Sequence, residues 1–151
     1  MGHTASAREA YGPRHRQAPG RRRPGQQFAP DLADVQGALC WALIRLGRFA
    51  EARGPTERAH GLDATDLNWT INLGHVELLT GDPAAAWRYY AEAVAQVPSA
   101  AVFEQGPVAD FELFIAKGWQ VKASRAALAR MRGEFARRDG ARKQEAGGGK
   151  P

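Results

Sequence analysis

The sequence has one cysteine, Cys40, among its 151 residues, so an internal disulfide bond is excluded. A lone cysteine favours a reducing compartment without fixing one. No stretch approaches the roughly 18 apolar residues in a row that a membrane-spanning helix needs. Residues 1–30 contain no apolar run of the length found in a secretory signal. We therefore expect a cytoplasmic protein without a membrane segment, stabilised by a hydrophobic core.

Catalytic motifs are also missing from the sequence. It contains no glycine-rich phosphate loop, no carboxylate pair spaced for acid–base catalysis and no serine in a nucleophile elbow. His75 and Glu77 stand in the His-x-Glu order of zinc deaminases, but one cysteine cannot supply the Cys-x-x-Cys that completes such a site. Cys40 has no histidine placed to activate it, which favours a packing role. We expect no catalytic activity, no metal and no cofactor.

Positive charge is concentrated at the two ends of the chain, whose net charge is +5. Residues 1–30 carry six arginines against one glutamate and are rich in proline, glycine and glutamine. This segment and the glycine-rich end, 139–151, bury too little apolar surface to offset the entropy of ordering them. They are predicted to be disordered tails around a folded, mildly acidic domain at 31–138. The 17 arginines against four lysines are typical of a GC-rich, bacterial genome.

From Asp31 onward, apolar residues recur at steps of three and four, which is the period of a helix. Glycines end several of these stretches, and Asp66 and Asp82 stand where side chains cap a helix start. Pro83 follows at the first helical position, where no N–H is needed. The pattern predicts an all-α protein with three helical hairpins and no strand. The expected helices cover 31–46, 48–61, 67–80, 83–96, an interrupted segment at 99–117, and 120–137.

Two of these hairpins align when the chain is shifted by about 34 residues. The aligned pairs are Leu39 with Leu73, Cys40 with Gly74, Gly47 with Gly81, Ala52 with Ala86, and Ala59 with Ala93. Small residues are expected where the two helices of a hairpin approach closely, and larger ones between hairpins. This period and these residues resemble the tetratricopeptide repeat (TPR) family. The segment from Leu73 to Pro98 matches best, the first unit is weaker, and the third fits only after a small shift.

The resemblance implies a short right-handed solenoid of helical hairpins, with two TPR-like units and a divergent third or capping hairpin. Proteins of this family bind another protein or peptide in a concave groove, so we expect a non-catalytic adaptor. The residues carried over to the groove are Asp34, Trp41, Ile44, Arg45, Asn68, Ile71, His75, Leu78 and Glu112, with Val108 and Ile115 beside them. Trp41 has a second interpretation, as a core residue of the first hairpin.

Other functions and partners remain open at this point. The first hairpin has no evident cap, so a homodimer through that edge or a longer repeat array is an alternative. The arginine cluster at 21–23 could bind nucleic acid nonspecifically with a strong salt dependence, although a solvated tail is favoured. The chain could also be a regulatory fragment of a larger enzyme.

Overall fold

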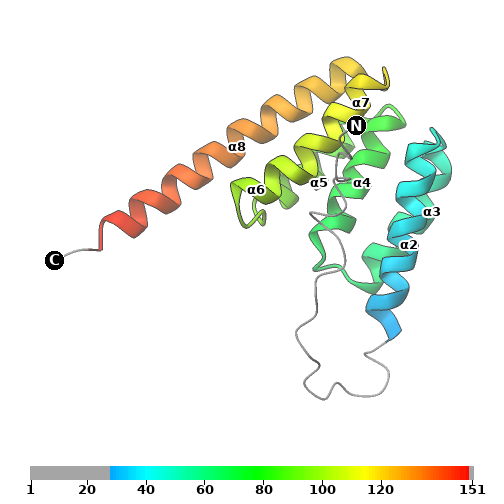
Figure 1. Ribbon diagram of the computed structural model, residues 1–151, viewed down its shortest axis with the longest axis horizontal. Coiled ribbons are helices and arrows are strands. Elements are labelled where there is room, and N and C mark those ends of the chain that lie inside the picture. The colour runs from blue at the N-terminus through cyan, green and yellow to red at the C-terminus, as the bar shows by residue number, and fades with distance from the viewer. Residues whose placement is uncertain (1–27, 150–151) are drawn as a thin grey trace, which may run out of the picture.

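The computed structural model describes residues 28–149, and within that range it contains helices and no strand (Figure 1). The all-α prediction is confirmed for this part of the chain. The helices are α2 (Phe28–Arg45), α3 (Phe49–Leu62), α4 (Leu67–Leu79), α5 (Pro83–Val94), α6 (Ala100–Phe103), a π-helical turn η1 (Glu104–Val108), α7 (Ala109–Ala116) and α8 (Val121–Gly147). Residues 1–27, and with them most of the predicted N-terminal tail, lie outside the described range.

The helix ends follow the local signals in the sequence. The Asp66 carboxylate accepts a hydrogen bond from the Asn68 N–H at 2.9 Å, and the Asp82 carboxylate accepts one from the Ala85 N–H at 2.9 Å. Gly47 and Gly81 end their helices with positive φ angles of 75° and 98°. Glycine adopts this left-handed backbone without the steric cost that a Cβ atom imposes.

The helices pack in adjacent pairs, which gives three hairpins (Figure 1). α2 packs on α3, α4 packs on α5, and α7 packs on α8, while α3–α4 and α5–α8 contacts join the pairs. The predicted pairing of neighbouring helices into hairpins is therefore present in the structure. η1 connects α6 to α7 and contains Pro107, which has no N–H to continue the regular hydrogen-bond ladder.

The close contact inside each of the first two hairpins lies at equivalent positions. A Cβ atom on Gly74 would lie 2.5 Å from Cε1 of Tyr90, so only glycine fits against that ring. One repeat length earlier, the Thr56 hydroxyl is 2.6 Å from the Cys40 sulfur. A glycine facing a large ring in one hairpin is thus matched by two medium-sized side chains in the other. The two hairpins divide the side-chain volume at this contact differently between their two helices. In both hairpins the two helices can therefore approach each other closely.

The third hairpin returns to the first, which a purely linear stack of repeats does not do. The Trp41 and Phe114 rings lie 6.5 Å apart between their centroids, and Phe49 meets Trp119 edge-on at 5.0 Å. These contacts join α2 to α7 and the α2–α3 corner to the α7–α8 corner. The first helices of the three hairpins therefore share one continuous core.

The last helix is longer than the sequence predicted. α8 continues to Gly147, whereas its end was expected near residue 137 and a disordered tail from 139 (Figure 1). Residues 139–147 consist mostly of good helix formers, and the Lys143 ammonium lies 2.8 Å from the Asp139 carboxylate one turn away. The helical assignment of 139–147 replaces the predicted tail there. No helix in the described part of the chain is long and apolar enough to cross a membrane.

Candidate functional site

The residues predicted to line a groove divide into a buried and an exposed group. Trp41, Ile44, Ile71, His75 and Leu78 have 6%, 0%, 2%, 0% and 1% of their surface exposed. A side chain without accessible surface cannot contact a partner. The prediction that these residues, His75 among them, line an open groove is therefore wrong in this structure. The third-unit residue Val108 is buried as well.

The burial follows from the position of α4. This helix packs against α2, α3 and α5, and its His75 ring meets the Phe111 and Phe114 rings of α7 edge-on. Along α4 only Asn68 and Glu77 keep appreciable exposed surface. The face that the groove prediction left open to a partner is covered by α7. For Trp41, the core interpretation holds, since its ring packs against Phe114.

A hydrogen-bonded group of polar side chains lies inside this core. His75 Nδ1 is 2.8 Å from the Tyr90 hydroxyl, and His75 Nε2 is 3.1 Å from the Asp110 carboxylate. Tyr90 is fully buried, and Asp110 is 7% exposed. The group joins α4, α5 and α7, so it fixes the third hairpin against the second. The group therefore contributes to holding these three helices together.

The Tyr90 phenol stays protonated inside this group. Burial, and secondly the negative charge of Asp110, raise the pKa of Tyr90 well above its ordinary value of 10.0. Both effects disfavour the phenolate. The Tyr90 hydroxyl therefore keeps its proton, and the two ring nitrogens of His75 link this hydroxyl to the Asp110 carboxyl group.

The raised pKa of Tyr90 predicts a loss of stability at alkaline pH. Above pH 10 the unfolded chain releases the Tyr90 proton and the folded chain keeps it, so the free energy of unfolding falls by about 1.4 kcal/mol per pH unit. This contribution is present below pH 10 and is lost as pH rises through the raised pKa. We expect Tyr90→Phe to flatten this part of the pH profile, measured by urea unfolding between pH 9 and pH 11. An unchanged slope in Tyr90→Phe would contradict the assignment.

Sequence reasoning missed Asp110 as a partner of His75. Its signal was one of the two carboxylates in the largely apolar run from Val108 to Ile115, of which Glu112 is exposed and Asp110 is buried. A buried carboxylate needs hydrogen-bond donors, and the donor here comes from a helix far away in the sequence. Cys40 is also confirmed as a packing residue, because it is fully buried against Thr56.

The remaining members of the predicted set are less buried and lie on three different helices. On α2, Arg45 is exposed and Asp34 is partly exposed; Asn68 is partly exposed at the start of α4, and Glu112 is exposed on α7. Asp34 and Arg45 share α2 with an apolar stripe of Leu32, Val35 and Leu39, which Leu46 continues one residue past the end of the helix. These four side chains are 53%, 61%, 44% and 69% exposed. We call this surface the α2 face.

Among the described residues, the α2 face contains four of the five large apolar side chains that are exposed, the fifth being Leu62. The helix buries its opposite side, where Gly37 lets the Trp69 ring approach and Cys40 and Ile44 enter the core. Leucines exposed singly on a surface are common, whereas several exposed apolar side chains in one stripe are less usual. The sequence shows the stripe as a helical period of apolar residues, but it does not show that the stripe is exposed.

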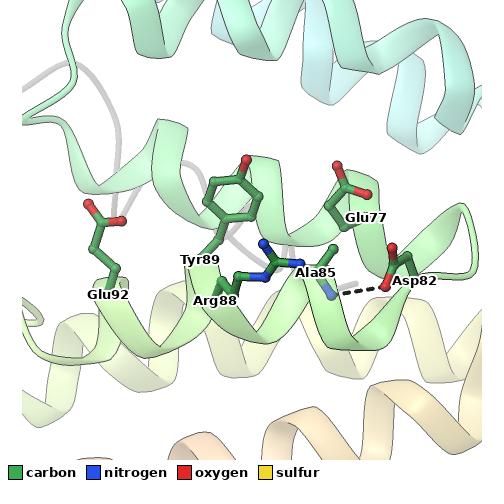
Figure 2. A pocket seen from close by; sticks show the side chains of 6 residues that line it. All are labelled: Glu77, Asp82, Ala85, Arg88, Tyr89 and Glu92. Carbon is green, nitrogen blue, oxygen red and sulfur yellow. Dashed lines mark hydrogen bonds between the residues drawn. The ribbon is translucent and has the colours of Figure 1, made fainter.

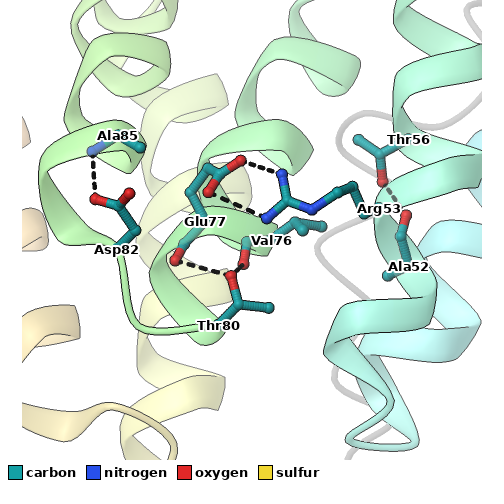
Figure 3. Close-up of polar contacts among 8 residues, drawn as sticks. All are labelled: Ala52, Arg53, Thr56, Val76, Glu77, Thr80, Asp82 and Ala85. Carbon is teal, nitrogen blue, oxygen red and sulfur yellow. Dashed lines mark hydrogen bonds and ion pairs between the residues drawn. The ribbon is translucent and has the colours of Figure 1, made fainter.

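A second surface feature is polar. A pocket of about 440 Å³ is lined by Glu77, Asp82, Ala85, Arg88, Tyr89 and Glu92, on α4, α5 and the turn between them (Figure 2). Glu77 is also bound by the Arg53 guanidinium from α3, with Nη2 to Oε2 at 3.1 Å (Figure 3). Asp82 is engaged in its capping bond to Ala85. Both carboxylates thus have structural partners within the fold.

No group of three or more histidine, cysteine, aspartate or glutamate side chains in the described range is placed to hold a metal ion. Comparisons of the chain with family models, curated proteins and solved structures find no match to any of them.

Proposed function

We propose that this protein is a non-catalytic TPR-like adaptor that binds another protein. The support is the repeated contact inside the two hairpins, Gly74 with Tyr90 and Cys40 with Thr56, at the predicted spacing of about 34 residues. Equivalent packing at one repeat length is the physical basis of helical-hairpin repeats. Such stacks commonly serve to present a surface to other proteins.

The binding surface proposed here is the α2 face and not a concave groove. α7 covers the groove side of α4, whereas the α2 face is exposed and apolar. Asp34 and Arg45, two of the residues that the TPR resemblance assigns to binding, lie on the same helix, about 140° and 120° around it from Leu39. The exposed apolar stripe is the single observation that carries this assignment, because burying it on a partner would remove its contact with water.

Affinity capture from a lysate of the source cells, with nuclease present, tests the proposal. We expect the full chain to retain protein partners that Leu39→Lys loses, because a charge at the centre of the stripe cannot be buried without a counter-charge. Leu62→Lys is the matched control, since Leu62 is 41% exposed and lies on α3. Equal retention by both variants would place binding elsewhere. Capture that disappears with nuclease would favour the nucleic-acid alternative, which rests on residues 1–30.

A further inference from the structure

We infer that the exposed side of α8 binds the phosphate backbone of double-stranded DNA, without sequence preference, by lying along the major groove. This goes beyond the proposed function, because it concerns another surface and another class of partner. The first observation is the division of charge along the chain. Residues 28–120 contain 12 acidic and six basic side chains, whereas residues 121–149 contain eight basic and three acidic ones. The positive charge of the described range is thus concentrated in one helix.

Within α8 the charges are also separated by side. At about 100° per residue, each acidic residue of α8 lies about 100° or more around the helix from Gly133. The side within about 80° of Gly133 carries five basic residues, all of them exposed: Lys122, Arg125, Arg130, Arg137 and Lys143. We call this surface the α8 face. Met131 and Phe135, which are buried in the core, lie about 160° around the helix from Gly133.

The basic side chains of the α8 face are accessible to an anionic partner. Arg137 pairs with Glu134 and Lys143 with Asp139, and all four residues belong to the surface of α8. Ion pairs on an exposed helix contribute little to stability, so phosphate groups can replace the carboxylates. The Arg130 guanidinium lies 3.7 Å from the centroid of the Trp87 ring, which positions this side chain and keeps its charge.

The composition of the α8 face distinguishes among anionic partners. Its central part consists mainly of small, exposed residues: Ala126, Ala129, Gly133, Ala136 and Gly140. The face has no aromatic side chain on which the bases of a single strand could stack. It also has no large apolar side chain to enter a membrane or to anchor a protein interface. The charges therefore favour the phosphate groups of a duplex.

The two sides of the α8 face correspond to the two strands of a DNA duplex. Arg130 and Arg137 lie on one side of Gly133, and Arg125 and Lys143 lie about 120° to 140° away on the other side. The major groove of B-DNA is about 12 Å wide, admits an α-helix and has a phosphate strand along each edge. The small residues let the backbone of α8 approach the groove, so that each pair of basic residues faces one strand. The major groove of an RNA duplex is too narrow for this arrangement.

The fold leaves α8 accessible to a long duplex. The Arg138 guanidinium donates hydrogen bonds to the Val94 and Val97 carbonyl groups at the end of α5. Beyond this residue α8 extends away from the other helices (Figure 1). A duplex that lies along α8 is thereby kept apart from the acidic remainder of the described range, which would repel it.

Fluorescence anisotropy with a labelled duplex of mixed sequence, about 20 base pairs long, tests the inference on the full chain between about 50 and 200 mM salt. We expect Lys122→Glu/Arg125→Glu to weaken binding by roughly 30-fold or more and to lower the salt slope by about 2, because two phosphate contacts are lost. The matched control is Arg45→Glu/Arg88→Glu, which changes the net charge equally at exposed positions on α2 and α5. Equal losses in both variants, or no binding by the natural sequence at about 50 mM salt, would overturn the inference.

Gly133→Leu tests the groove arrangement without a change in charge. No atom lies within 4 Å of a Cβ placed there, so the fold accommodates leucine. The larger side chain would hold α8 away from the base edges, and we expect binding to weaken roughly tenfold. An unchanged affinity, or equally tight binding of single-stranded DNA or duplex RNA, would exclude the groove-bound arrangement.

Two further variants separate this surface from the other candidates. Loss of DNA binding in Arg21→Ala/Arg22→Ala/Arg23→Ala, with Lys122→Glu/Arg125→Glu unaffected, would move the site to the N-terminal segment and overturn the inference. Leu39→Lys should bind DNA as the natural sequence does, because the α2 face takes no part in it. A failure of DNA binding and a failure of protein capture are therefore distinguishable.

Discussion

Replacing Gly74 by leucine should destabilise the folded protein by about 3 kcal/mol or more and lower its melting temperature by roughly 10 °C. The first added atom, Cβ, would lie 2.5 Å from Cε1 and 2.7 Å from Cδ1 of Tyr90, well inside contact distance. The ring cannot move away easily. It is fully buried, hydrogen-bonded to His75 and packed edge-on against Phe111 at 5.2 Å. α4 and α5 would have to separate.

The matched control is Gly133→Leu in α8. No atom lies within 4 Å of a Cβ placed there, and the residue is exposed. Since leucine favours a helix over glycine by close to 1 kcal/mol, this variant should be slightly more stable than the natural sequence. Opposite signs for the same chemical change would show that packing, and not helix propensity, decides the result at Gly74. Equal melting temperatures for Gly74→Leu and the unaltered chain would refute the contact between α4 and α5.

The second large effect is expected at His75. Phenylalanine keeps an aromatic ring in the same space but can neither accept from Tyr90 nor donate to Asp110. His75→Phe would leave a buried carboxylate and a buried hydroxyl without their partner. Breaking one member of a buried charged or polar group typically costs about 3 kcal/mol or more. Chemical denaturation at neutral pH measures the loss.

Asp110→Asn separates the role of the hydrogen bond from that of the charge. Its amide oxygen still accepts from His75 Nε2, so we expect a loss of about 1 kcal/mol, clearly smaller than that of His75→Phe. Because the group joins α4, α5 and α7, His75→Phe should also increase amide hydrogen exchange along α7. An equal loss in the two variants would mean that the charge of Asp110, and not the hydrogen-bond chain, stabilises the core.

The sequence predicted the elements of the fold well because their signals are local. The caps at Asp66 and Asp82 involve N–H groups two and three residues away, and the glycine ends at Gly47 and Gly81 depend on one backbone angle each. The repeat spacing also predicted a close approach at Gly74. Antiparallel helices joined by a short turn meet at positions fixed by their lengths.

The same reasoning misplaced much of the candidate site, because nothing local says what covers a helix. Trp41 and His75 are buried by Phe114, which lies in another hairpin, and the partner of His75 is Asp110. The end of α8 was predicted wrongly from a local signal. The prediction gave the glycines near the C-terminus more weight than the helix-forming residues between 139 and 147.

The sequence by itself determined that the chain forms helical hairpins, where α3, α4 and α5 start and end to within two residues, and which small residues allow two helices to touch. Only the tertiary structure decided that α7 closes the groove side and that the α2 face stays exposed. The physical reason is that leucines along one side of a helix have the same spacing in the sequence whether that side faces the protein core or a partner. Which of the two it faces depends on contacts between hairpins far apart in the chain.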